Sequence, residues 1–140
     1  MFILDTDCLS LLQRGNAESV IFQIRLNNLT PSEIATTIIT YEEQMRGWLA
    51  VTKKAQSIDE LVASYSRLFK HSETYKYIKV LEFDYSAATT YEQLRKEHRR
   101  LGAMDLKIAA IAISMQATLL SRNLKHFGEI SHLRAEDWTV

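Results

Sequence analysis

The chain has 140 residues, with 17 Lys and Arg against 17 Asp and Glu, so its formal net charge is zero. This length predicts one domain, residues 1–140, with a sizeable core, and the charge balance excludes binding of nucleic acid through overall positive charge. The single cysteine, Cys8, excludes an internal disulfide and fits a reducing cytoplasm, and we expect neither a secretory signal nor a membrane span.

The first predicted element is a short buried strand, residues 1–4, which ends at Asp5. An apolar helix follows at once and is expected to end at Gly15. Asp5 therefore stands at the carboxyl end of a strand, which is where open α/β sheets bind their ligands. A helix cap at Thr6 or Asp7 is an alternative explanation for the polar residues here. One acid suffices for a cap, so the second acid stays unexplained.

The next elements are an amphipathic helix at residues 20–29 and a second strand at residues 33–40, which is rich in β-branched side chains. A helix is expected to begin at Thr40. Glu43 would lie one turn into this helix, where its side chain can reach the same crevice as Asp5. Thr40 followed three residues later by Glu43 also fits a capping box, in which Glu43 would only close the helix end. The pattern leaves both interpretations open.

The middle of the chain, from Leu49 onward, is predicted to be helical. Ser57 and Glu60 form a second capping-box pattern, which we interpret as structural because no strand precedes it. A set of apolar residues recurs at helical spacing and is expected to face the core or a neighbouring helix. These residues are Leu61, Val62, Tyr65, Leu68 and Phe69.

A third strand is predicted at residues 78–83, followed by a helix at residues 85–100 that Asp84 caps. The end of this helix is basic and includes Arg99 and Arg100. Cations at a helix C-terminus are ordinarily solvated and favoured by the helix dipole. The functional alternative is a patch that contacts phosphates, placed just before the stretch that carries the third candidate acid.

The stretch from Gly102 to Asn123 organises the rest of the chain. It contains Asp105, then a helix that is apolar nearly all round and so is expected to be buried, then a short strand at residues 117–120. A buried helix that leads into a strand is half of a βαβ unit and predicts an α/β fold with a mostly parallel sheet. Burial of Asp105 requires compensation, either as a cap or by convergence with other acids. The tail is expected to add a last short strand.

Four blocks of the sequence together resemble PIN-domain ribonucleases, and more narrowly the VapC-type toxins of bacterial toxin–antitoxin pairs. The blocks are MFILDTDCLSLL, TYEEQMRG, GAMDLKIAAIAI, and ATLLSRNLKHF with ISHLRAEDW. They span nearly the whole chain, in the order and with the spacing of that family. The resemblance implies a PIN-like fold, a mostly parallel central sheet flanked by helices.

The resemblance further implies that Asp5, Glu43 and Asp105 are the three core metal-binding acids. The fourth position of the family pattern, often an acid, falls on Asn123, which we expect to assist the metal or to orient water. Asp7 stands where many members have Asn. The asparagine at the fourth position affects how tightly a second metal ion would be held, and does not affect binding of the first.

Clustered acids make chemical sense in a phosphodiesterase. Hard cations such as Mg²⁺ or Mn²⁺ bind carboxylate oxygens and keep several waters. Such an ion polarises a phosphate and makes its bound water ionise more readily, whereas three carboxylates without a cation would repel one another. No Ser-His-Asp or Cys-His arrangement competes, because Cys8 has no evident base partner.

The sequence therefore predicts a Mg²⁺-dependent endoribonuclease, with Mn²⁺ as a possible substitute, in which Arg99, Arg100 and Arg122 contact RNA. By resemblance, it would be a dimeric toxin inhibited by a small antitoxin protein. The alternative is a catalytically weak PIN-like module that binds RNA or a partner, which Asn123 keeps open. Cleavage of DNA is a third hypothesis, because an acidic site does not by itself read the sugar.

Overall fold

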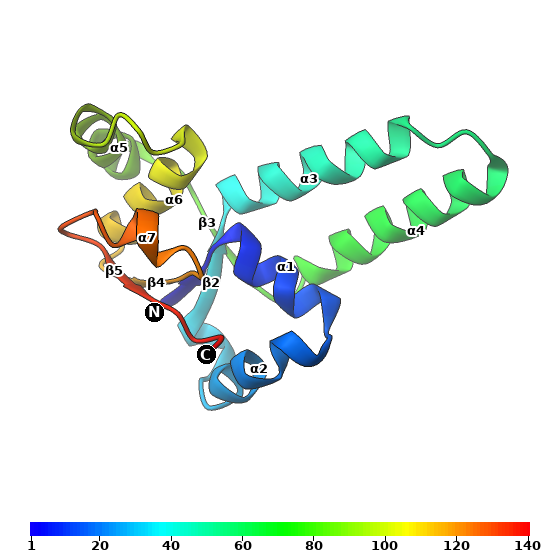
Figure 1. Ribbon diagram of the computed structural model, residues 1–140, viewed down its shortest axis with the longest axis horizontal. Helices are drawn as coiled ribbons and strands as arrows, with labels where there is room; N and C mark the ends of the chain where they lie inside the picture. The colour runs from blue at the N-terminus through cyan, green and yellow to red at the C-terminus, as the bar shows by residue number, and fades with distance from the viewer.

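The computed structural model describes residues 1–140 as five strands, seven α-helices and two short 3₁₀ turns (Figure 1). The strands are β1 (Phe2–Leu4), β2 (Ile34–Thr37), β3 (Lys79–Leu81), β4 (Thr118–Leu120) and β5 (Arg134–Glu136). The α-helices are α1 (Thr6–Arg14), α2 (Val20–Asn27), α3 (Ile38–Lys53), α4 (Ile58–Thr74), α5 (Tyr85–Glu97), α6 (Ala103–Ser114) and α7 (Leu124–Phe127), and the 3₁₀ turns are η1 (Ala17–Ser19) and η2 (Pro31–Glu33). None of the helices is both long and apolar enough to cross a membrane.

The five strands form one parallel sheet in the order β3-β2-β1-β4-β5. The chain builds outward from β1 in one direction through β2 and β3, and in the other direction through β4 and β5. This reversal places a topological switch point between β1 and β4, where open α/β sheets form a crevice at their carboxyl edge. The predicted α/β class and the last strand from the tail are confirmed.

The two faces of the sheet carry separate cores, because side chains alternate along each strand. Ile3 and Leu119 point to one face and join a cluster that includes residues of α5 and α6. Leu4 and Leu120 point to the opposite face and pack with residues of α1 and α2. Helices therefore cover both faces, which is the burial that a parallel sheet requires.

The helix α6 is the buried element that its composition predicts. Its residues from Leu106 to Ala112 are all buried except Lys107, and they pack in the larger core cluster. Gly15 also takes its predicted role, since it follows α1 with a left-handed backbone (φ of 60°). A left-handed residue after a helix is favoured as glycine because it has no Cβ to clash.

Two predicted boundaries are wrong for reasons that affect candidate residues. The strand β2 ends at Thr37, because the Thr37 side chain accepts a hydrogen bond from the Thr40 amide and starts α3 there. The helix α5 ends at Glu97, so Arg99 and Arg100 lie in the turn that follows and not in the helix.

The helices α3 and α4 form an antiparallel hairpin that projects from one side of the sheet (Figure 1). The apolar face predicted to be buried in α4 is largely exposed: Val62, Tyr65 and Phe69 are 65%, 56% and 66% exposed. That prediction is wrong because helical periodicity identifies an apolar face without showing what the face meets. Here the hairpin extends beyond the sheet, so the face has no partner within the chain.

Candidate active site

Asp5 lies at the carboxyl end of the central strand β1 and is only 5% exposed. Its Oδ1 accepts a hydrogen bond of 2.8 Å from the Cys8 amide, so it caps α1. Burial raises the pKa of Asp5 above its ordinary value, and hydrogen bonds from Ser121 and Cys8 oppose that rise. No Lys or Arg pairs with it. Asp5, and neither Thr6 nor Asp7, is therefore the cap of α1, and it is a desolvated carboxyl without a cationic partner.

Glu43 lies in the second turn of α3, on the side that faces α1. Its Oε1 accepts a hydrogen bond of 2.6 Å from the Thr6 hydroxyl, and Thr6 Oγ1 lies 3.1 Å from Thr40 Oγ1. Because Thr37 caps α3, Thr40 is inside the helix and cannot form a capping box with Glu43. The capping interpretation of Glu43 is therefore wrong. The Glu43 side chain instead forms a hydrogen bond with Thr6, the residue that follows Asp5.

Asp105 lies in the first turn of α6. Gly102 is the N-cap residue of this helix and no side-chain hydrogen bond caps it, so Asp105 is a first-turn acid that the helix dipole favours but is not the capping residue. The half-buried carboxyl makes no hydrogen bond within the chain. Burial raises its pKa, and the nearby His126 opposes the rise. Because a crossover helix runs antiparallel to the parallel strands it joins, the start of α6 lies toward the carboxyl edge of the sheet.

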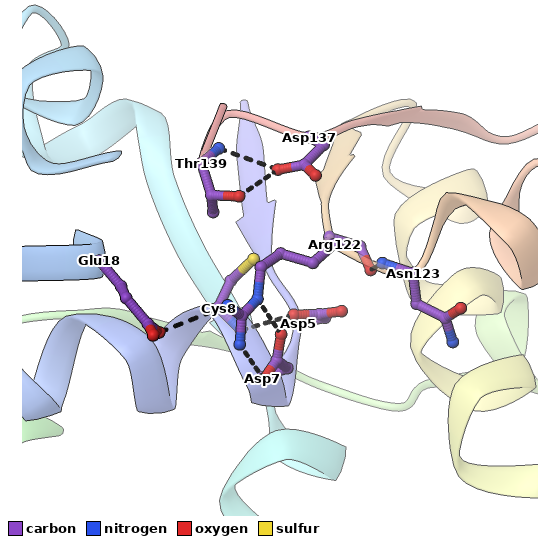
Figure 2. A network of polar contacts seen from close by, with 9 residues as sticks. Asp5, Asp7, Cys8, Glu18, Arg122, Asn123, Asp137 and Thr139 are labelled. Carbon is purple, nitrogen blue, oxygen red and sulfur yellow. Dashed lines mark hydrogen bonds and ion pairs between the residues drawn. The ribbon is translucent and has the colours of Figure 1, made fainter. Parts of the chain in front are cut away.

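Asn123 follows β4, on the other side of the switch point from Asp5. The buried Ser121 accepts a hydrogen bond of 2.9 Å from the Asn123 amide, which fixes the turn. The Asn123 side-chain nitrogen lies 3.0 Å from Nδ1 of His126, one turn along in α7. In Figure 2 the Asn123 side chain points away from its neighbour Arg122. The turn therefore directs the side chains of Asn123 and Arg122 to different sides.

Arg122 makes a two-point ion pair with Asp7, with Nε to Oδ2 at 2.7 Å and Nη2 to Oδ1 at 2.9 Å (Figure 2). Glu18 is a more distant partner, at 3.9 Å. The guanidinium lowers the pKa of Asp7 below its ordinary value. The second acid of the Asp5-Thr6-Asp7 run is therefore explained by a contact with the turn after β4, which no local pattern in the sequence indicates.

Three further residues considered from the sequence are Cys8, Arg99 and Arg100, and the structure adds a fourth, Thr6. Cys8 is 1% exposed, and burial raises the pKa of its thiol, so no thiolate nucleophile is available. Arg99 and Arg100 are exposed and form no ion pair within the chain. Thr6 is the residue that sequence reasoning missed, because its hydroxyl meets Glu43 only once α1 packs against α3.

No three His, Cys, Asp or Glu side chains are grouped closely enough to hold a metal ion between them. The donors still suit a hard cation, since Asp5 and Asp105 are desolvated carboxyls without Lys or Arg partners. Mg²⁺ commonly binds through one or two carboxylates plus waters and substrate phosphates, and does not need a cage of protein ligands. These carboxylates can therefore bind a cation whose remaining ligands are waters and a phosphate of the substrate.

Comparisons with known proteins agree on one family. Residues 2–133 match the PIN domain family. The chain is 30% identical to Ribonuclease VapC1 of Haemophilus influenzae strain R2866 over 142 residues, which cover 99% of this chain and 98% of that protein. It is 31% identical to Ribonuclease VapC2 of Rickettsia felis over 109 residues, 75% of this chain and 74% of that protein.

Solved structures show the same fold. A chain in the structure of VapBC-1 from nontypeable Haemophilus influenzae superposes with a TM-score of 0.76 at 26% identity, covering 99% of this chain and 98% of that chain. A chain in DNA-bound VapBC from Salmonella typhimurium gives a TM-score of 0.69 at 27% identity, covering 98% and 97%. The match therefore extends over the whole sheet and the projecting hairpin.

Proposed function

The chain belongs to the PIN-domain family, and from this premise we propose that it is a metal-dependent endoribonuclease, the toxin of a toxin–antitoxin pair. We treat residues 1–140 as a single PIN-like domain. The relatives that carry the name ribonuclease align with nearly all of the chain or three quarters of it. One observation supports catalysis in this chain most strongly: Asp5 and Asp105 are desolvated carboxyls that no Lys or Arg of the chain neutralises.

We propose that Asp5, Glu43 and Asp105 are the acids that bind the cation, which is Mg²⁺ or, in its place, Mn²⁺. Because the three carboxylates are not grouped into a closed metal cage, waters and the phosphate of the substrate would complete the coordination. When bound, such a cation supplies positive charge against the phosphoryl oxygens and makes water more acidic. The residues of the chain do the rest. The hydroxyl of Thr6 orients Glu43 through its 2.6 Å hydrogen bond. We expect the side chain of Asn123, which lies beside His126, to assist the metal or to orient water.

Binding of RNA is assigned to exposed arginines. Arg99 and Arg100 are free of intramolecular ion pairs and lie in the turn just before α6, so they can steer phosphates toward Asp105. Arg122 could contact RNA only after it leaves Asp7, so its first role is to hold the turn before Asn123. We propose that the chain acts in the cytoplasm, where it would meet RNA.

The partners follow from the same premise. Solved structures similar to this chain are VapBC assemblies from Haemophilus influenzae and Salmonella typhimurium. We therefore propose that an antitoxin protein inhibits this chain and that the toxin forms a homodimer. Co-expression with a short reading frame found beside the gene, followed by size-exclusion chromatography with light scattering, tests both proposals in one measurement.

A second candidate function is a PIN-like module that binds RNA or a partner but cleaves poorly. Two observations favour it: Asn123 replaces the acid of the fourth position, and no three donors are grouped for a metal. Incubation with a labelled single-stranded RNA, and with DNA of the same sequence, separates the possibilities. Cleavage of RNA alone supports the endoribonuclease, binding without cleavage supports the module, and equal cleavage of DNA contradicts selectivity for RNA.

A further inference from the structure

A groove of about 650 Å³ lies between α1, α3 and α4 and extends away from the acidic site. Each helix contributes one face to it, with Arg14 on α1, Trp48 on α3 and Lys70 on α4 among the lining residues. One end of the groove reaches Thr6 and Glu43. Its volume lies within the range of ordinary small-molecule sites, so it has room for a nucleotide.

The lining of the groove is cationic. Arg14, Arg67 and Lys70 line it, and none of them forms an ion pair within the chain. Glu43 is the single acid of the lining, at the end next to the active site. Three unpaired cations along one channel, in a chain with no net charge, are a local concentration of positive charge that suits an extended anion.

Gly47 lines the groove and has no structural requirement for glycine. It lies in the interior of α3 without a positive φ, and a Cβ built there would meet no atom of the chain within 4 Å. Glycine in a helix interior costs about 1 kcal/mol relative to alanine. Packing within the chain gives no reason for a glycine at this position. The backbone of a ligand that passes over α3 would occupy the open space and would be a reason for it.

The wall beside Gly47 is aromatic. Trp48 is half-buried and lines the groove together with His71, and their ring centroids are 6.5 Å apart. His71 is 4% exposed and both of its ring nitrogens lack a hydrogen-bond partner. Burial lowers the pKa of His71, so its ring is neutral and presents no charge to a base. Stacking of a base on an aromatic side chain is worth about 1–3 kcal/mol.

We propose that this groove binds a single-stranded segment of the RNA substrate next to the phosphate that is cleaved. Phosphates contact Arg67 and Lys70, the sugar–phosphate backbone passes over Gly47, and a base lies against Trp48. The inference rests on the proposed endoribonuclease function and adds the path that the RNA takes across the protein. Cations combined with an aromatic wall fit a nucleic acid better than an acidic peptide, which would use the charges but not the ring.

A binding assay tests the cations separately from catalysis. Binding of a short fluorescent single-stranded RNA is measured by anisotropy in chelator at several salt concentrations. We expect Arg67→Ala with Lys70→Ala to weaken binding about tenfold and to reduce the salt slope by about 0.7 for each lost contact. Lys53→Ala with Lys54→Ala removes the same charge from the exposed tip of the hairpin and should leave binding and slope near those of the parent.

Substitution of Gly47 tests the open space. Gly47→Leu places a bulky side chain on the groove side of α3, and its Cβ meets no atom of the chain within 4 Å. Leucine also has a higher helix propensity than glycine, so we expect the fold to be retained with an equal or higher melting temperature. We expect RNA binding to weaken about tenfold or more. Gly47→Ala gives the same gain in helix propensity but fills little space, and should bind RNA nearly as the parent does.

The outcomes separate this inference from the proposed function. If the parent cleaves RNA while the groove variants bind it with the affinity and salt slope of the parent, the inference is overturned and the function stands. If the groove variants lose only the co-expressed antitoxin, the groove is a protein-binding site and the inference is again overturned. If the parent neither binds nor cleaves RNA, the proposed function falls and this inference falls with it.

Discussion

At the residue scale, the three candidate acids differ in what holds them. One oxygen of Asp5 caps α1, and Glu43 accepts a hydrogen bond from the Thr6 hydroxyl. The carboxyl of Asp105 makes no hydrogen bond within the chain. Sequence patterns single out all three acids as candidates, since each stands near the end of a predicted strand or the start of a predicted helix. The patterns could not decide which acids are caps, because capping depends on a boundary shift of a few residues.

Glu43→Gln separates charge from hydrogen bonding at this position. The amide keeps an acceptor for Thr6, so we expect metal-free stability within about 0.5 kcal/mol of the parent. The loss of charge should remove most of the stabilisation by Mg²⁺ and most RNA cleavage, since a ligand stabilises only the state that binds it. Thermal melts with and without Mg²⁺ measure the first effect and a cleavage assay the second.

Glu42→Gln is the matched control for Glu43→Gln. Glu42 is the neighbouring acid on α3 and forms an exposed salt bridge with Arg46. Its substitution should leave both the Mg²⁺ response and RNA cleavage unchanged. Equal behaviour of the two variants would remove Glu43 from the metal site.

The pKa shift of Asp105 predicts a pH dependence of stability. Its pKa in the folded protein is raised above the ordinary value of 3.8, so between the two values the folded state binds more protons than the unfolded state. Without metal, this residue therefore lowers stability as pH rises through that window. Thermal melts in chelator, run from about pH 3 to about pH 7, span the ordinary titration range of a carboxyl and the region above it. In these melts Asp105→Asn should flatten the decline and be more stable than the parent at neutral pH.

Two other acids must be considered in that pH profile. Asp5 has a raised pKa of the same origin, so part of the decline should persist in Asp105→Asn. The pKa of Asp7 is lowered by Arg122, so its contribution is lost only as pH falls below its ordinary range. A profile for Asp105→Asn that coincides with that of the parent would contradict the burial of an ionised Asp105.

At the scale of elements, the turn between β4 and α7 is fixed from two directions. Ser121 holds it from within, and Asp7 of α1 holds Arg122 from across the switch point. The sequence predicts the strand before this turn, whereas the short helix α7 after it was not predicted. The pair of Asp7 and Arg122 joins residues 115 positions apart, and such a contact depends on the strand order, which no local pattern carries.

Asp7→Asn tests this tie. Because the two side chains are 49% and 34% exposed, the pair should contribute only about 0.5–1 kcal/mol to stability. We expect the loss in Asp7→Asn to shrink in high salt, which screens the parent's ion pair. RNA cleavage should fall several-fold as the turn before Asn123 loosens. Chemical denaturation at low and high salt measures the stability term, and an unchanged free energy of unfolding at low salt would contradict it.

The projecting hairpin predicts a contrast between two apolar positions. Val62 on α4 is 65% exposed, whereas Ile111 on α6 is 1% exposed. Val62→Ser should therefore change the free energy of unfolding by less than about 0.5 kcal/mol, as for other exposed positions. Ile111→Ala should cost about 2–5 kcal/mol through lost burial and a cavity. Denaturant titrations of both variants, at a concentration where the chain is monomeric, check this, and similar losses would mean that the α4 face is buried.

At the scale of the whole molecule, strand order brings the candidate residues to one edge of the sheet. β1 and β4 are neighbours, so Asp5 and Asn123 flank the switch point although they are far apart in the sequence. The alternation of buried helix and short strand predicted this class of fold. The outward course of the α3–α4 hairpin was not predictable, because an apolar helix face has the same periodicity whether it meets a sheet or a partner.

Cleavage of a labelled single-stranded RNA by the parent and by Asp105→Asn, purified side by side, tests the endoribonuclease assignment most directly. The parent should cleave with Mg²⁺, stop when chelator is added in excess of the metal, and resume when Mg²⁺ is restored in excess of the chelator. Asp105→Asn should lose most cleavage, on the order of a hundredfold or more, while it remains folded. Cleavage that persists in chelator, or that is equal in the two proteins, would contradict a metal-dependent nuclease built on these acids.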